Sequence, residues 1–213
     1  MKLELNDVSK SYQQGDVRIV VLSSINLKIE DNSSNLILGP SGCGKTTLID
    51  LISLLTSPSQ GEIRINEAYT TALSEDESYS LRRSDIGIIR QRDNLLPFLN
   101  LVENVKVPQI NRDETKAINL LQDMEITELN TCPRELSLFT QQKVALTRAL
   151  INNPTIILAD EPTGELNSSD TDRYLKLLLN KTEQAVLLVV SNNNELEKYF
   201  ENVFYLKDGS LSE

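Results

Sequence analysis

The run Gly39–Thr46, Gly-Pro-Ser-Gly-Cys-Gly-Lys-Thr, is the feature that most constrains this chain. It matches the pattern G-x-x-x-x-G-K-[ST] in full, follows the apolar run Leu36–Leu38 and precedes a helical pattern in Leu48–Leu55. Glycines in such a strand–loop–helix unit let backbone N–H groups approach a phosphate closely. We therefore interpret the run as a phosphate-binding loop, not as a chance match in a glycine-rich surface loop.

The side chains of this loop divide into cationic and oxygen-bearing groups. The Lys45 ammonium is expected to reach the β and γ phosphates of a nucleotide, and the Thr46 hydroxyl to bind Mg²⁺. The candidate nucleotide-binding residues of the loop are Gly39, Ser41, Gly42, Cys43, Gly44, Lys45, Thr46 and Thr47.

Composition limits the other function classes. With 213 residues, of which 39% are hydrophobic, the chain is predicted to form one α/β domain over residues 1–213. Its net charge of -10 argues against a nucleic-acid partner. Cys43 and Cys132 suggest no disulfide framework, which favours a reducing compartment. No signal pattern or membrane-length apolar stretch is visible, so a membrane role is expected only through a partner.

The N-terminal part of the chain predicts an antiparallel sheet. Apolar and polar residues alternate over residues 3–5 and 20–29, and Gln13–Asp16 forms the turn between them. Tyr12 lies just before this turn, where its ring can either stack on adenine or pack on a neighbouring strand. Spacing alone does not separate these two interpretations. Another short strand is predicted for residues 62–66.

Residues 67–150 are predicted to contain a polar loop and a helical subdomain. Residues 67–84 favour a loop with one helical turn, and Arg82 and Arg83 are interpreted as a solvated basic pair. Helical periodicity recurs within residues 95–150, which predicts the subdomain. The later elements are expected at residues 169–179 (helix), 185–190 (strand), from 194 (short helix), and 203–206 with 210–211 (paired strands).

Two buried strands are predicted to end in polar side chains. Residues 86–89 lead to Gln91, and residues 155–159 lead to Asp160 and Glu161. Ligands bind at the carboxyl ends of parallel strands in nucleotide folds. One carboxylate of the pair can hold Mg²⁺ while the other orients and polarises an attacking water.

These motifs together resemble the ATP-binding subunits of ABC transporters over nearly the whole chain, from about Leu3 to Gly209. Within that family, the sequence is most similar to the subunits of lipoprotein-release, macrolide and antimicrobial-peptide exporters. The residues that carry the resemblance are Gly39–Thr47, Ile86–Gln91, Asn94–Pro97, Val102–Val105, Ile156–Gly164 and Tyr205–Gly209.

The resemblance implies a P-loop NTPase (RecA-like) α/β core with an antiparallel β subdomain and a helical subdomain. It implies that Tyr12 stacks on adenine, that Thr46, Gln91 and Asp160 surround Mg²⁺, and that Glu161 is the catalytic base. Two such subunits are expected to enclose two ATP molecules, each site being completed by the partner's signature helix. The partners are then a second ATP-binding subunit and a transmembrane permease, which would place the chain on the cytoplasmic face of the membrane.

Three positions depart from the family pattern. The signature Leu-Ser-Gly-Gly-Gln aligns with residues 136–140, where Leu136 and Ser137 are kept and the sequence continues Leu-Phe-Thr. The switch histidine is replaced by Asn192, whose amide can hydrogen-bond a phosphate or a water but cannot take up and transfer a proton near neutral pH as imidazole can. Asn167 stands where the dimer-communication loop usually ends in aspartate.

These departures leave alternatives open. The chain is predicted to be an ATPase that hydrolyses slowly, with Ser137 contacting the partner's nucleotide and Asn192 at the switch position. The alternative is a regulatory module whose partner subunit performs hydrolysis. A soluble P-loop NTPase without a membrane partner is disfavoured by the residues around Gln91 and Asp160.

Overall fold

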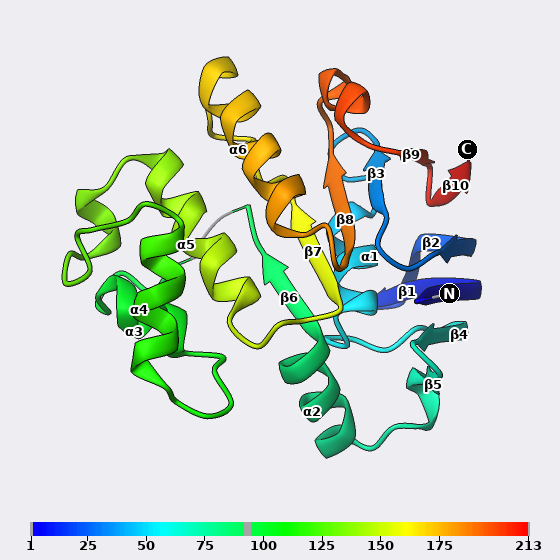
Figure 1. Ribbon diagram of the computed structural model, residues 1–213. Coiled ribbons are helices and arrows are strands. Elements are labelled where there is room, and N and C mark those ends of the chain that lie inside the picture. The colour runs from blue at the N-terminus through cyan, green and yellow to red at the C-terminus, as the bar shows by residue number, and fades with distance from the viewer. Residues whose placement is uncertain (1, 92–94, 213) are drawn as a thin grey trace.

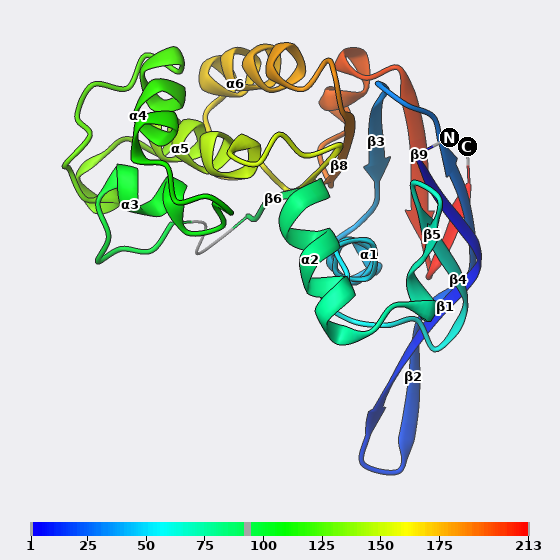
Figure 2. The same cartoon turned by 60° about the horizontal axis from the view of Figure 1, so that its bottom comes forward.

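The computed structural model describes residues 2–91 and 95–212, and Figures 1 and 2 show it from two sides. The strands are β1 (Leu3–Gln14), β2 (Val17–Ile29), β3 (Ser34–Leu38), β4 (Gln60–Ile65), β5 (Ala68–Tyr69), β6 (Ile86–Ile89), β7 (Ile156–Asp160), β8 (Val186–Ser191), β9 (Asn202–Lys207) and β10 (Ser210–Ser212). The α-helices are α1 (Lys45–Ile52), α2 (Glu75–Asp85), α3 (Leu101–Lys106), α4 (Glu114–Asp123), α5 (Leu138–Leu150) and α6 (Ser168–Lys181). Short 3₁₀ helices are η1 (Thr70–Ala72), η2 (Pro133–Glu135) and η3 (Asn194–Tyr199).

A mostly parallel sheet forms the centre of the described structure. Its strand order is β10-β9-β3-β8-β7-β6, and β3 pairs in parallel with both β8 and β9. Strands β6, β7 and β8 also pair in parallel, so only β10 runs against its neighbour. The carboxyl ends of β3, β7 and β8 therefore meet at one edge, where ligands bind in such sheets.

At β3, β7 and β8 both faces of this sheet are buried, which explains why these strands contain continuous apolar runs. Successive side chains of a strand point to opposite faces. Leu36 and Leu38 accordingly pack with α5 and α6 in one core cluster, whereas Ile37 packs with α1 and the second sheet in the other. The sequence signal at residues 36–38 thus reflects burial on two sides.

The second sheet is antiparallel, with the order β2-β1-β4-β5. Strands β1 and β2 pair from Leu3 opposite Ile29 to Gln14 opposite Val17. Their far end projects beyond the body of the molecule as a hairpin (Figure 2). The structure thus contains the predicted antiparallel strands and their connecting turn.

Helices α3, α4 and α5 gather beside the β6 edge of the central sheet (Figure 1). They lie within residues 95–150, the range predicted to be helical, although the division of the chain into domains stays a prediction. Helix α5 begins at Leu138, three residues before the predicted start at Gln141, because the Ser137 side chain accepts a hydrogen bond from the Thr140 N–H and caps it. Within the described residues, no helix combines the length and apolar character needed to cross a bilayer.

The prediction for residues 67–84 was wrong in two respects. Residues 75–85 form α2, which has a capping box in which Ser74 and Glu77 exchange hydrogen bonds. Arg82 and Arg83 are not a solvated pair. Arg82 donates to the Leu54 carbonyl at 2.8 Å, and Arg83 donates to the carbonyls of residues 108 and 109. The polar composition of residues 67–84 concealed the helix. Hydrogen bonds to distant segments of the chain hold the two arginines.

Tyr174 on α6 offers a test of the core. Its side chain is fully buried, and its hydroxyl has no hydrogen-bond partner among the residues that the structure describes. Burial also raises the pKa of this phenol. Because an unpaired buried hydroxyl is destabilising, Tyr174→Phe is expected to raise the free energy of unfolding by about 1 kcal/mol, measured by urea denaturation.

Tyr199→Phe is the matched control for this prediction. The Tyr199 hydroxyl donates to an Asp172 carboxylate oxygen, so its removal breaks a bond and is expected to lower stability or leave it unchanged. A loss of stability in Tyr174→Phe comparable to that in Tyr199→Phe would show that the buried hydroxyl is satisfied in solution.

Candidate functional site

The predicted phosphate-binding loop connects β3 to α1. Gly44 is the N-cap of α1 and has a left-handed backbone conformation with φ 109°. A Cβ atom at Gly44 would lie 2.8 Å from Leu22 Cδ2, and one at Gly39 would lie 2.3 Å from the Leu206 carbonyl oxygen. These two positions require glycine because of backbone conformation and close packing. The loop therefore packs closely against the end of the sheet, and the first turn of α1 faces a pocket that Lys45 and Thr46 line.

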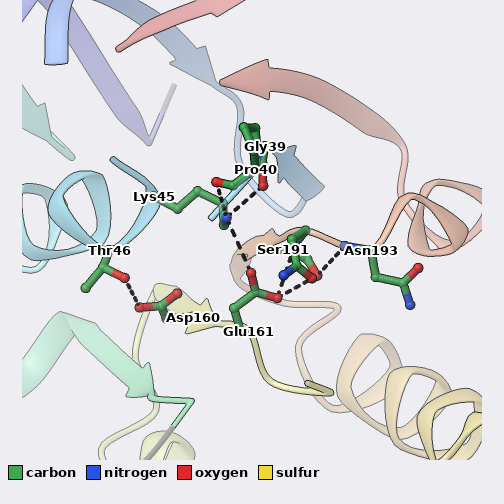
Figure 3. Close-up of polar contacts among 9 residues, drawn as sticks. Gly39, Pro40, Lys45, Thr46, Asp160, Glu161, Ser191 and Asn193 are labelled. Atoms are coloured by element: carbon green, nitrogen blue, oxygen red, sulfur yellow. Dashed lines mark hydrogen bonds and ion pairs between the residues drawn. The ribbon is translucent and has the colours of Figure 1, made fainter. Parts of the chain in front are cut away.

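Lys45 is the cation of the loop. Its side chain is only 7% exposed, and Nζ donates to the carbonyl oxygens of Gly39 at 2.7 Å and Pro40 at 3.0 Å. The same nitrogen lies 3.4 Å from Glu161 Oε1, as Figure 3 shows. The two carbonyls are neutral and do not compensate the ammonium charge, which is therefore shared between Glu161 and an anion that enters the loop.

Thr46 and Asp160 bring two oxygen ligands together. The Thr46 hydroxyl donates to Asp160 Oδ2 at 2.8 Å (Figure 3). Burial raises the pKa of Asp160 from its ordinary value, and the hydrogen bond from Thr46 opposes this shift. Mg²⁺ prefers hard oxygen ligands and takes few of them from the protein, so this pair fits a magnesium ion that also contacts phosphates and water.

Glu161 is held in an unusual backbone conformation. Its φ of 47° lies in the left-handed region, which is uncommon for a residue with a side chain, and the residue is 8% exposed. Oε2 accepts hydrogen bonds from Ser191 Oγ at 2.9 Å and from the Asn192 backbone N–H at 3.2 Å. The carboxylate is thus held at both oxygens, by Lys45 on one side and by the end of β8 on the other.

One pocket of about 210 Å³ unites most of the predicted site residues. Glu161 also lines a second, polar pocket of about 570 Å³ together with Asn192. The residues that line the first pocket are Val21, Ser41, Gly42, Gly44, Lys45, Thr46, Thr47, Gln91, Asp160 and Glu161.

Other predicted residues lie away from the first pocket. Tyr12 is on the β1–β2 hairpin, opposite Ile19, with a side chain that is 42% exposed and Lys10 Nζ 5.1 Å from its ring centre. Ser137 caps α5, and its hydroxyl lies 2.9 Å from that of Thr140. Cys43 packs against the antiparallel-sheet core.

Two pocket features were not predicted from the sequence. Val21 lines the pocket from β2, and Ser191 contacts Glu161 from the end of β8. The signal for Ser191 was available, since it follows a predicted buried strand of a parallel sheet, as Asp160 does. Val21 had no signal, because its position depends on how two distant sheets pack. Asn94, part of the motif around Gln91, lies outside the described residues.

Comparison with known families identifies the chain. The model described as ABC transporter matches residues 22–164, which include the loop, Asp160 and Glu161. The chain belongs to the ABC transporter family. This membership confirms the predicted resemblance, the function class of an ABC-type ATP-binding subunit, and the enzyme class of an ATPase.

Individual relatives span the whole chain. The ABC transporter ATP-binding protein MJ0796 of Methanocaldococcus jannaschii is 37% identical and covers 98% of this chain and 94% of its own length. The lipoprotein-releasing system ATP-binding protein LolD of Desulfotalea psychrophila is 40% identical, covering 97% and 96%. A dimeric structure of MJ0796 bound to ADP and Pi superposes with a TM-score of 0.90, at 36% identity over 99% of this chain and 97% of that one. These likenesses confirm the predicted ABC ATPase fold.

Proposed function

We propose that this chain is the ATP-binding and slowly ATP-hydrolysing subunit of an ABC-type membrane exporter. The observation that carries the proposal is the single pocket into which β3, β7 and α1 bring Lys45, Thr46, Asp160 and Glu161. The similarity to LolD supports an exporter with a separate transmembrane permease. The dimeric relative supports pairing with a second ATP-binding subunit. In this arrangement the chain lies on the cytoplasmic face of the membrane, held there by the permease.

We assign the residues as follows. The loop amides and Lys45 bind the phosphates of ATP, and Tyr12 stacks on adenine from the projecting hairpin. Thr46, Gln91 and Asp160 hold Mg²⁺, which when bound neutralises charge on the β and γ phosphates. Glu161 accepts the proton of the attacking water. Its fixed carboxylate suits this role, because a base must lie within hydrogen-bond reach of the proton that it removes.

We expect hydrolysis to be slow because bulky side chains occupy the first turn of α5. Leu138 is 47% exposed there, at a position where the family has glycine. Phe139 is half-buried, and its ring lies 4.5 Å from the Arg173 guanidinium of α6. This contact holds Phe139, and Leu138 precedes it on the helix turn that would approach the partner's γ-phosphate. Asn192, lacking a titratable ring, further weakens stabilisation of the transition state.

The bulky Leu138 and Phe139 in the first turn of α5 also favour a second candidate function. If Leu138 and Phe139 prevent a productive contact with the partner's ATP altogether, the chain acts as a regulatory nucleotide-binding module. The partner subunit then performs all hydrolysis. ATP binding by Lys45 is expected in both cases, so the two functions differ in turnover by the isolated chain.

A fourfold variant tests the proposed attenuation. Leu138→Gly, Phe139→Gly, Thr140→Gln and Asn192→His together are expected to raise ATP turnover at least about tenfold, since one transition-state donor is commonly worth more than that. The measurement compares parent and variant in steady-state ATPase activity and in ATP-dependent dimerisation by size-exclusion chromatography.

A control is needed because the four substitutions also change the stability of α5. Two added glycines cost up to about 2 kcal/mol of helix stability, and the contact between Phe139 and Arg173 is lost as well. A version that retains Phe139 separates these effects, because it opens only the exposed position. Parental turnover as fast as that of intact family members would overturn the attenuation, as would a folded fourfold variant that gains no activity.

A further inference from the structure

Ser191 occupies a buried position directly behind the carboxylate of Glu161. It is the last residue of β8, it is 1% exposed, and its hydroxyl donates to Glu161 Oε2 at 2.9 Å. The Asn193 backbone N–H donates to Ser191 Oγ at 3.2 Å (Figure 3). Because the oxygen accepts from Asn193, the single hydroxyl hydrogen is left to point at Glu161.

The Glu161 side chain has several rotatable bonds, so the direction of its carboxylate depends on the groups that contact it. Lys45 approaches Oε1 at 3.4 Å, but that lysine is expected to turn toward phosphate when ATP is bound. Among the residues that the structure describes, the hydrogen bonds that remain on the carboxylate are then those from the Ser191 hydroxyl and the Asn192 backbone N–H, both to Oε2. Oε1 is left to face the pocket, where an attacking water would lie.

We propose that Ser191 is a positioning residue for ATP hydrolysis in this chain, holding Glu161 in the orientation in which one carboxylate oxygen faces the nucleotide pocket. The inference rests on the proposed role of Glu161 as the base. The inference also distinguishes the Ser191 side chain, which holds Glu161, from the Asn192 side chain. Asn192 contacts Glu161 through its backbone N–H, so this contact survives a change of the Asn192 side chain. The base is therefore held without a switch histidine.

Kinetics of Ser191 variants test the proposal. Ser191→Ala is expected to lower kcat about tenfold to a hundredfold with KM for ATP unchanged, because a small displacement of a reacting group costs up to about 10²-fold. Ser191→Thr keeps the hydroxyl and is expected to restore most of the rate. Thr182→Val is the matched control, since Thr182 is buried and its hydroxyl donates to the Leu178 carbonyl at 2.8 Å, away from the pocket. It is expected to alter stability but not kcat.

A second measurement does not depend on activity. Unfolding midpoints of the nucleotide-free parent, Ser191→Ala, Glu161→Ala and the double variant form a cycle. The proposal predicts that Ser191→Ala lowers the midpoint in the parent and clearly less in the Glu161→Ala background. Additive effects would overturn the inference, as would a Ser191→Ala protein with parental kcat. Absence of hydrolysis in the parent, combined with coupling in the cycle, would instead overturn the proposed ATPase function and leave the Ser191 contact in place.

Discussion

Replacing Lys45 with alanine is expected to weaken ATP binding by roughly 1.5–3 kcal/mol, or about ten- to a hundredfold, because hydrogen bonds to charged groups are worth that much. In the structure, Nζ is buried and lies between the loop carbonyls and Glu161. Its removal leaves Glu161 without this cation and leaves the phosphates without their main positive partner. Isothermal titration calorimetry with ATP measures the loss.

Lys45→Met separates charge from volume. Methionine fills the space of the lysine stem without its ammonium, so both variants are expected to bind ATP weakly. Lys181→Ala serves as the matched control, because that lysine pairs with Asp123 far from the pocket and should leave ATP affinity unchanged. Parental affinity in Lys45→Met would show that the ammonium does not contact the nucleotide, and the site assignment would then fail.

Glu161→Gln is expected to reduce ATP turnover by about 10²–10⁴-fold while leaving ATP binding intact, since it removes a general base and keeps the side-chain shape. The glutamine carbonyl can still accept from the Ser191 hydroxyl, so the local packing is retained. ATP-bound dimers should accumulate, and size-exclusion chromatography with ATP would detect them.

The control for this variant is Glu183→Gln, an exposed glutamate just after α6. It removes the same charge from the chain and is expected to keep the parental rate. Persistence of hydrolysis at the parental rate in Glu161→Gln would mean that another group accepts the proton, and the role of Glu161 would have to be withdrawn.

The sequence predicted the centre of this site because its signals are local. Gly39–Thr46 is a contiguous motif, and Gln91 and Asp160 each follow an apolar strand. Parallel pairing of β6, β7 and β8 places such strand ends at one edge, so the residues line one pocket. Local chemistry and sheet topology were sufficient for this part.

The features that the sequence did not predict depend on tertiary contacts or on signals that composition concealed. Helix α2 carries a visible capping box at Ser74 and Glu77, yet its polarity favoured a loop. Arg82 and Arg83 bind carbonyls of segments that spacing cannot place. Spacing also did not determine the role of Tyr12, because its ring is exposed on a hairpin and contacts Lys10.

The central claim is that this chain itself hydrolyses ATP, slowly and with magnesium, through Glu161. The most direct measurement is the release of inorganic phosphate from ATP by the purified chain, with Mg²⁺ and with EDTA, for the parent and for Glu161→Gln. The account predicts slow release by the parent with Mg²⁺, and release at the protein-free level with EDTA or in the variant. Equal release by parent and variant, or release by the parent that is unaffected by EDTA, would contradict it.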